Sequence, residues 1–169
     1  MAFWGYLALV AVVGYLLGNL NGAILISKFI LREDVRQHGS GNAGLTNFLR
    51  SYGGGLTLVV LAIDVIKAVA AALIGGWILG RFLNAPELGK MVGGGFAVIG
   101  HMFPVFFQFR GGKGILSSAA LAGVMDWRIL AAILVVFLLA VILTRYVSLG
   151  SCLGAVAFTP AFAWCYPGQ

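Results

Sequence analysis

Three short segments of this 169-residue chain gather the residue types that could hold an anionic substrate. The first, from Gly39 to Arg50, reads GSGNAGLTNFLR and places three glycines among polar side chains. An arginine offers a planar fork to phosphate, and hydroxyl and amide donors bind strongly to an ionised oxygen. These donors are Ser40, Asn42, Thr46, Asn47 and Arg50. The alternative is a hydrophilic connector in which Thr46 or Asn47 caps a helix, but so many glycines beside so many donors favour a ligand.

The second segment, from His101 to Gly114, reads HMFPVFFQFRGGKG. Glycines bring the backbone close to a ligand and aim amide hydrogens at it, and a lysine adds a full positive charge, which is how proteins hold phosphate. The residues concerned are Gly111, Gly112, Lys113 and Gly114. The spacing is not that of a Walker loop, because Gly114 follows the lysine. A flexible turn at the surface is the plainer alternative.

His101 opens the second segment with a titratable ring. It could act as a general base or donate a hydrogen bond to phosphate, and it could equally be a helix-end histidine bonded to a carbonyl. The third segment, RYVSLGS, adds Arg145, Ser148 and Ser151. Its alternative is an arginine and an aromatic residue at the membrane interface.

Two charged pairs accompany these segments. Asp64 and Lys67 lie inside a long apolar run, where each charge costs about 3 kcal/mol on insertion scales, so they must be paired or face a polar cavity. Their spacing of three places them on one helix face, which favours a structural ion pair over a proton or substrate path. Asp34 and Arg36 could tie down the first segment as an ion pair, or be solvated charges.

Several common catalytic designs are missing from the sequence. There is no serine nucleophile elbow, no histidine and acid four residues apart, and no metal-ligand cluster. Cys152 and Cys165 are 13 residues apart in an apolar stretch, which suits core residues better than zinc or a redox pair. We therefore expect neither a metal nor a cofactor.

The elements that position these segments are membrane helices. Hydrophobic residues make up 61% of the chain and charged residues 9%, with a mean hydropathy of +1.02, far from the composition of a soluble domain. No charge occurs in the first 27 residues, so the opening apolar run lacks the basic start of a cleaved signal peptide. The net charge of +6 lies in short loops, which favours membrane topology over nucleic-acid binding.

The sequence predicts an all-α integral membrane protein, a compact bundle of about six transmembrane helices in a single domain over residues 1–169. The runs are continuous rather than alternating, which favours helices over a barrel, and the glycines at 14, 18, 22, 75, 76 and 80 suit close helix contacts in lipid. The apolar runs are Phe3 to Phe29, Gly54 to Leu79, Met91 to Phe107, Ile115 to Met125, Ile129 to Thr144 and Val147 to Trp164.

Basic residues set the expected orientation. If every run crosses once, seven lie on one side (Lys28, Arg32, Arg36, Arg50, Arg110, Lys113 and Arg145) and three on the other (Arg81, Lys90 and Arg128). The positive-inside rule then places the amino terminus outside and all three polar segments in the cytoplasm.

In this order and on one membrane face, GSGNAGLTNFLR, GHMFPVFFQFRGGKG and RYVSLGS resemble the three signature motifs of the bacterial acyl-phosphate-dependent glycerol-3-phosphate acyltransferases, the PlsY family. The resemblance runs from about Gly18 to Ser151. It implies an enzyme of the bacterial inner membrane that moves a fatty acyl group from acyl phosphate to the first hydroxyl of glycerol 3-phosphate, giving lysophosphatidic acid in the first step of phospholipid synthesis.

The resemblance also implies roles for single residues. Glycerol 3-phosphate would be held by Ser40, Arg50, Lys113 and Ser151, and acyl phosphate by Asn42, Thr46, His101, Gly111, Gly112 and Gly114. Asn47, Arg145 and Ser148 would complete the binding site, with Lys113, His101 and Ser151 closest to catalysis. Acyl phosphate carries a good leaving group, so positioning and charge stabilisation suffice for direct transfer, with a substrate phosphate oxygen or His101 taking the hydroxyl proton.

The chain departs from the family pattern in three places. Leu45 gives GLTN where GATN is usual, and Ile115, Leu116 and Ser117 stand where a small residue and threonine usually follow GGKG. Family members usually continue through a further helix and a basic tail, so we expect this chain to be truncated at its carboxyl end. The rival functions are a membrane anion or phosphate transporter, for which we find no internal repeat, and another membrane transferase acting on a phosphorylated lipid.

Overall fold

The computed structural model describes residues 2–166, and every regular element in that range is a helix. The predicted all-α class is therefore confirmed. The chain divides into two compact units, Met1–Leu121 and Ala122–Gln169. The assignment of one acyltransferase domain to residues 1–169 stays a prediction.

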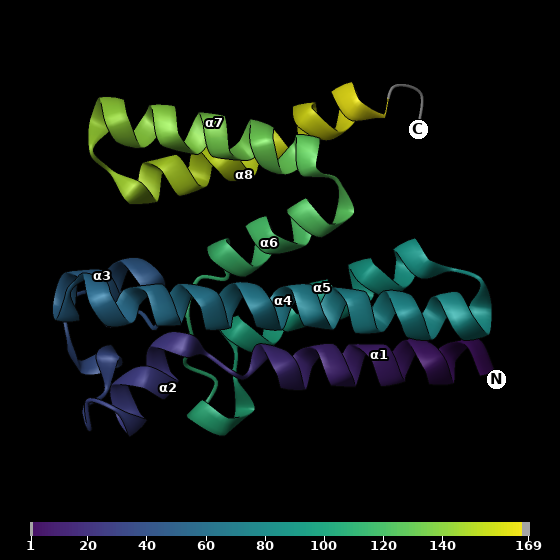
Figure 1. Cartoon of the computed structure of the whole chain (residues 1–169), viewed down its shortest axis with the longest axis horizontal. Helices are drawn as coiled ribbons and strands as arrows, with labels where there is room; N and C mark the ends of the chain where they lie inside the picture. The colour runs from purple at the N-terminus through teal and green to yellow at the C-terminus, as the bar shows by residue number, and fades with distance from the viewer. Residues whose placement is uncertain (1, 167–169) are drawn as a thin grey trace. The chain divides into compact units, whose positions relative to one another are not determined.

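The first unit is built on three long helices that lie side by side, α1 (Ala2–Gly18), α4 (Gly54–Leu83) and α5 (Pro86–Met102), as Figure 1 shows. Shorter elements join them: α2 (Gly22–Phe29), η1 (Val35–Gln37), α3 (Leu45–Tyr52) and η2 (Val105–Phe107). The helix α6 (Ile115–Met125) begins in this unit. Three long helices thus frame the loops that carry the first two polar segments.

Glycines bring the three long helices into backbone contact. A Cβ added at Gly14 would lie 2.3 Å from the carbonyl oxygen of Gly93, and one at Gly18 would lie 2.2 Å from that of Ala97. Gly75 meets Gly89 in the same way, at 2.2 Å. The predicted close helix contacts are confirmed, because no side chain larger than hydrogen fits between these backbones.

The first apolar run, predicted as one span, is broken. Helices α1 and α2 meet at a bend of 43° around residues 19–21. Asn21 caps α2, its Oδ1 accepting the amide of Ile24 at 3.1 Å, and Asn19 Nδ2 donates to the carbonyl of Tyr15 at 2.7 Å. Asparagine side chains compete with the helical backbone for its hydrogen bonds, so two of them two residues apart interrupt the helix.

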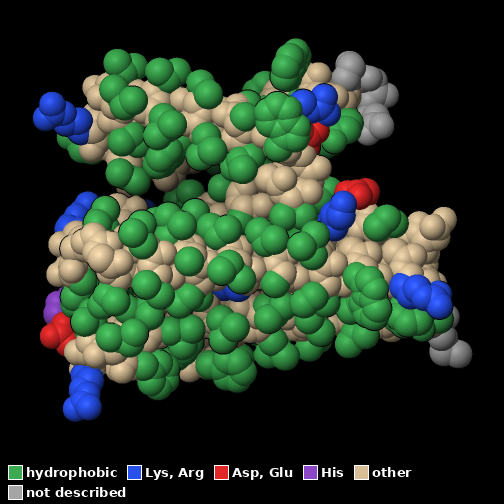
Figure 2. Space-filling model, viewed as in Figure 1, with side chains coloured by type: hydrophobic (Ala, Val, Ile, Leu, Met, Phe, Trp, Pro, Cys, Tyr) green, Lys and Arg blue, Asp and Glu red, His purple; other side chains and the backbone are tan. Residues whose placement is uncertain are grey.

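Within residues 2–166, four helical segments have the length and apolar composition to cross a membrane: Gly54–Leu83, Pro86–Phe107, Trp127–Thr144 and Val147–Cys165. The bent pair α1 and α2 makes a fifth if it is one span, and α6 is a shorter apolar helix of 11 residues. Hydrophobic side chains cover most of the face of the helices seen in Figure 2, and charged side chains lie mainly near helix ends. Six crossings and an outside amino terminus stay predictions.

The second unit packs α7 (Trp127–Thr144) against α8 (Val147–Cys165). Asp126 precedes α7 as its N-cap, and its side chain accepts a hydrogen bond from the backbone amide of Arg128 at 2.8 Å. The same carboxylate forms an ion pair with the guanidinium of Arg128 at 2.7 Å. This hydrogen bonding holds the pKa of Asp126 well below its usual range. Tyr166 Oη donates to the carboxylate at 2.9 Å, so one acid joins the start of α7 to the end of α8.

Candidate functional site

Asn47 shapes the first polar segment. Its side chain is buried, its Oδ1 accepts the amide of Ser40 at 2.9 Å, and its Nδ2 reaches three backbone carbonyls at 3.0 to 3.1 Å. Those carbonyls belong to Val35, His38 and Asn42. An amide with all its polar atoms bonded to the backbone positions a loop rather than a ligand. The sequence had suggested Thr46 or Asn47 as a helix cap, which is wrong: α3 begins after Gly44, and no side chain caps it.

Gly39 permits this arrangement. Its φ is +54°, and a Cβ there would lie 2.3 Å from Asn47 Oδ1, so only glycine suits both the conformation and the space. Ser40, Thr46 and Arg50 remain exposed on the folded segment, and Asn42 is half-buried. The donors predicted for a ligand are therefore accessible, with Asn47 beneath them.

Arg36 ties the first segment to the second. Its guanidinium pairs with Asp34 at 2.7 Å, so of the two alternatives that the sequence left open the ion pair is the one observed. Its Nη1 donates to the carbonyl of Phe107 at 2.8 Å and to that of Arg110 at 3.2 Å. The hydrogen bond from Arg36 lowers the pKa of Asp34 to about 2. A single arginine thus fixes two segments that are some 70 residues apart in sequence.

The glycine loop lies directly against the first segment. The amide of Ala43 donates to the carbonyl of Gly111 at 3.4 Å. The amides of Gly111 and Gly112 donate to the carbonyls of Met102 and His101, each at 3.1 Å. These two glycine amides are thus used within the loop, contrary to the expectation that they point at a ligand. The amides of Lys113 and Gly114 have no acceptor among residues 2–166.

Lys113 is exposed between the buried Gly112 and Gly114, and α6 begins two residues after Lys113, at Ile115. The free amides of a helix's first turn and a lysine beside them suit an anion. Gly114 has a φ of +75°, which turns the chain sharply into the helix. Lys113 and the start of α6 therefore supply the positive end of the candidate site.

Asp64 and Lys67 form the predicted ion pair, at 2.7 Å, with their side chains 1% and 2% exposed. Both also serve the break between α1 and α2: Asp64 Oδ1 accepts the amide of Gly22 at 3.1 Å, and Lys67 Nζ donates to the carbonyl of Leu20 at 2.9 Å. Backbone groups freed by a helix break must find partners in an apolar setting. The ion pair supplies them, and so has a structural role.

His101 lies over this ion pair, with its ring 5% exposed. Its Nδ1 is 2.8 Å from Lys67 Nζ, so a lysine contacts the ring where the sequence had suggested a carbonyl. Its Nε2 faces Gly112, where an added Cβ would lie only 2.2 Å away. His101 thus joins the buried ion pair to the glycine loop.

The third segment belongs to the second unit, where most of it is helical. Arg145 ends α7 with a φ of +61°, and α8 begins at Val147, so Ser148 and Ser151 lie on the first turns of a helix, inside the predicted apolar run from Val147 to Trp164. Arg145 and Ser148 are exposed, and Ser151 Oγ donates to the carbonyl of Val147 at 2.9 Å. A hydroxyl bonded to its own helix keeps two lone pairs for other donors.

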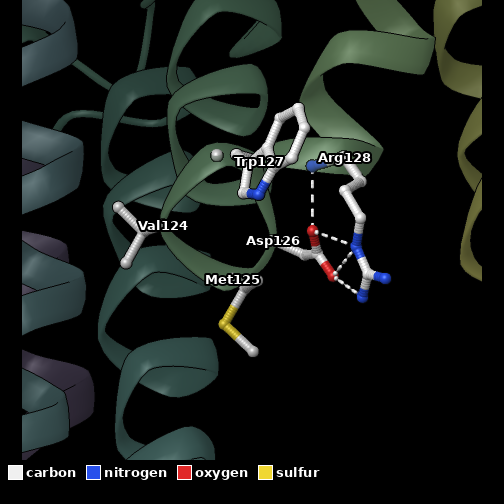
Figure 3. A pocket seen from close by; sticks show the side chains of 6 residues that line it. Val124, Met125, Asp126, Trp127 and Arg128 are labelled. Atoms are coloured by element: carbon white, nitrogen blue, oxygen red, sulfur yellow. Dashed lines mark hydrogen bonds and ion pairs between the residues drawn. The ribbon is translucent and has the colours of Figure 1, made fainter. Parts of the chain in front are cut away.

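An open hollow of about 500 Å³ lies at the turn between α6 and α7, shown in Figure 3. It is lined by Gly123, Val124, Met125, Asp126, Trp127 and Arg128. None of the predicted site residues lines it. Its two charged side chains bond to each other, so it is a weaker candidate than the joined loops.

Asn21 is the site residue that sequence reasoning missed. It is fully buried, and its Nδ2 donates to the carbonyl of Ala43 at 3.0 Å and lies 3.5 Å from His101 Nδ1. The available signal was two asparagines in an otherwise apolar run, since polar groups at such depth need specific partners.

Comparison with known proteins identifies the family. The model of the family described as glycerol-3-phosphate acyltransferase matches residues 8–168. The chain belongs to the glycerol-3-phosphate acyltransferase family. A family member from Thermoanaerobacter pseudethanolicus is 40% identical over 153 residues, covering 90% of this chain and 74% of its own. One from Chlorobaculum tepidum is 42% identical over 160 residues, covering 90% of this chain and 68% of its own.

Solved structures of the family share the fold. A crystal structure of PlsY, an integral membrane glycerol 3-phosphate acyltransferase, in its glycerol 3-phosphate form superposes with a TM-score of 0.83 at 31% identity, covering 96% of this chain and 79% of that one. The lysophosphatidic acid form superposes with a TM-score of 0.80 at 30% identity, covering 95% of this chain and 78% of that one. The chain is thus an all-α integral membrane protein of the predicted family, and the transporter alternative has no support.

Proposed function

We propose that this protein transfers a fatty acyl group to the first hydroxyl of glycerol 3-phosphate, giving lysophosphatidic acid, and that acyl phosphate is the donor. The observation that carries the proposal is family membership over residues 8–168, in a family whose solved structures include glycerol 3-phosphate and lysophosphatidic acid forms. The direct contact between the first segment and the glycine loop supports it, because a reaction between two phosphate-bearing substrates needs two anion-binding segments side by side.

Each substrate has its own set of proposed ligands. Glycerol 3-phosphate takes Ser40, Arg50, Lys113 and Ser151. Acyl phosphate takes Asn42, Thr46, His101 and the backbone amides of Lys113 and Gly114, whereas the amides of Gly111 and Gly112 are already bonded within the loop. The exposure of Ser40, Arg50 and Lys113 supports the first set, and the free amides of Lys113 and Gly114 support a phosphate at the loop. Arg145 and Ser148 are proposed as further ligands. Asn47 we reassign to shaping the loop, since its amide is fully bonded to backbone.

The proposed reaction is a direct transfer. The hydroxyl oxygen of glycerol 3-phosphate bonds to the acyl carbonyl carbon while the bond from that carbon to the phosphate oxygen breaks, and the hydroxyl proton leaves with the phosphate. Lys113 offsets the negative charge that gathers on the phosphate oxygens. Positioning of two bound substrates supplies much of the acceleration. A trapped acyl-enzyme adduct would contradict this scheme.

The proposed setting is the bacterial inner membrane, with the site on the cytoplasmic side. The excess of Lys and Arg near the first two segments supports this orientation under the positive-inside rule. Membrane lipid surrounds the protein, and no nucleic acid is involved.

The deciding experiment supplies purified protein in lipid vesicles with acyl phosphate and labelled glycerol 3-phosphate, and uses acyl-CoA as the control donor. We expect labelled lysophosphatidic acid with acyl phosphate only. Product formed from acyl-CoA would refute the proposal that acyl phosphate is the donor. Uptake of the label into the vesicles without product would refute the proposal that the protein is an acyltransferase. Lys113→Ala should abolish activity, and Lys90→Ala, a helix lysine paired with Glu87 at 2.7 Å, should leave it unchanged.

A further inference from the structure

The ammonium group of Lys67 has three hydrogen-bond donors and no acceptor. It meets three acceptors: Asp64 Oδ1 at 2.7 Å, the Leu20 carbonyl at 2.9 Å and His101 Nδ1 at 2.8 Å. Each donor thus has one partner. Because the ammonium can only donate, Nδ1 of His101 must accept through its lone pair and carries no proton.

The other groups that face Nδ1 agree with this assignment. Asn21 presents its NH₂ group at 3.5 Å, because its Oδ1 is already occupied by the amide of Ile24. Asp64 Oδ1 is also 3.5 Å away, but at shorter distances it accepts from Lys67 and from the amide of Gly22. Donors therefore surround Nδ1, and the nearest carboxylate oxygen is engaged elsewhere.

We propose that Lys67, held by Asp64, is a positioning residue that fixes His101 in the tautomer with its proton on Nε2. The Nε2–H group is then a hydrogen-bond donor on the side of the glycine loop. Resting on the proposed function, we assign its acceptor as an oxygen of the acyl phosphate. His101 has no free lone pair in this tautomer, so the hydroxyl proton goes to a substrate phosphate oxygen.

Gly112 keeps the donor accessible. A side chain there would begin 2.2 Å from Nε2 and 2.7 Å from the carbonyl of Ala43. Nε2 has no hydrogen-bond acceptor within residues 2–166, although the ring is almost wholly enclosed. A donor that no protein group accepts, on the face of a loop suited to anions, is available to a ligand.

The test is spectroscopic and needs no activity. The chain has two histidines, so ¹⁵N-histidine labelling of the His38→Gln variant leaves His101 as the sole signal. At a pH of about 8, above the ordinary pKa of a histidine side chain, long-range ¹H–¹⁵N spectra should show a proton on Nε2 and none on Nδ1. A protonated Nδ1 would overturn the proposal.

Lys67→Met should shift the proton toward Nδ1, which can then donate to Asp64. The matched control is Lys90→Met, which removes a lysine with the same spacing of three and the same 2.7 Å distance to its acid, but outside the site. It should leave the His101 signals as in the wild type. An unchanged tautomer in Lys67→Met would refute the role of Lys67, and the wild-type spectrum tests the tautomer even if that variant fails to fold.

Activity separates a donor from a base. His101→Gln keeps an NH₂ group near the position of Nε2, and His101→Asn does not reach it, while neither can act as a base. We expect His101→Gln to retain at least about tenfold more acyl transfer than His101→Asn, the value of a hydrogen bond to a charged group. Equal loss in both would overturn the donor role. A wild-type protein with the expected tautomer but no acyl transfer would refute the proposed function and support the tautomer.

Discussion

Asn47 Oδ1 accepts the backbone amide of Ser40 at 2.9 Å, and this contact sets the geometry of the first polar segment. The same side chain reaches the carbonyls on both sides of the loop, so one amide group holds a dozen residues in one conformation. Because Ser40, Thr46 and Arg50 project from that conformation, the position of three proposed ligands depends on a side chain that contacts no substrate.

Asn47→Asp tests this dependence. The carboxylate can still accept from Ser40 but cannot donate to the carbonyls of Val35, His38 and Asn42. Burying those unpartnered groups costs about 2 kcal/mol. We expect a lower melting temperature and a higher KM for glycerol 3-phosphate. Asn84→Asp, at an exposed helix end, is the control for KM and should leave it unchanged. An unchanged KM in Asn47→Asp would contradict the positioning role.

Gly112→Ala tests the contact between the glycine loop and His101. The added methyl group meets His101 Nε2 and the carbonyl of Ala43 at distances that the backbone can relieve only by moving. A displacement near 1 Å can cost about a hundredfold in rate, so we expect a loss of that order in kcat/KM. Gly95→Ala adds the same methyl group where nothing lies within 4 Å, and should keep full activity.

The Asp34–Arg36 pair predicts how stability depends on pH. The pKa of Asp34 is lowered to about 2 in the folded protein, so its contribution is present above the ordinary value of 3.8 and is lost as the pH falls from there toward 2. Unfolding measured from pH 5 to pH 2 should show a wild-type advantage over Asp34→Asn of about 1 kcal/mol, after allowing for solvent screening, that fades with acid. Glu87→Gln removes an exposed acid and is the control. A difference in unfolding free energy between the wild type and Asp34→Asn that does not change with pH would refute the claim that the stabilisation comes from the ion pair.

Arg50→Lys tests the proposed ligand for glycerol 3-phosphate. Lysine keeps the charge but not the planar fork, so a two-point contact with phosphate becomes a single one. We expect KM for glycerol 3-phosphate to rise about tenfold, with kcat less affected. Arg81→Lys, in the last turn of α4, supplies the control. Equal effects of both changes on KM would contradict a specific contact between Arg50 and the phosphate.

Local pattern was sufficient for much of the fold. Composition predicted membrane helices, glycine spacing predicted close helix contacts without saying which helices meet, and charge spacing predicted the pair Asp64–Lys67. The Asp34–Arg36 pair was left open between an ion pair and solvated charges. What failed depended on distant parts of the chain. The amides of Gly111 and Gly112 were expected to face a ligand, but they bond to the end of α5, and the break at residues 19–21 is stabilised by α4.

The helix break also has a consequence for biogenesis. Synthesis proceeds from the amino terminus, so Leu20 and Gly22 precede Asp64 and Lys67, and His101 comes last. When the charged pair of α4 enters the bilayer, its backbone partners are already there. We therefore expect α1, α2 and α4 to assemble first, and α5 to bring its histidine to a lysine that is already oriented.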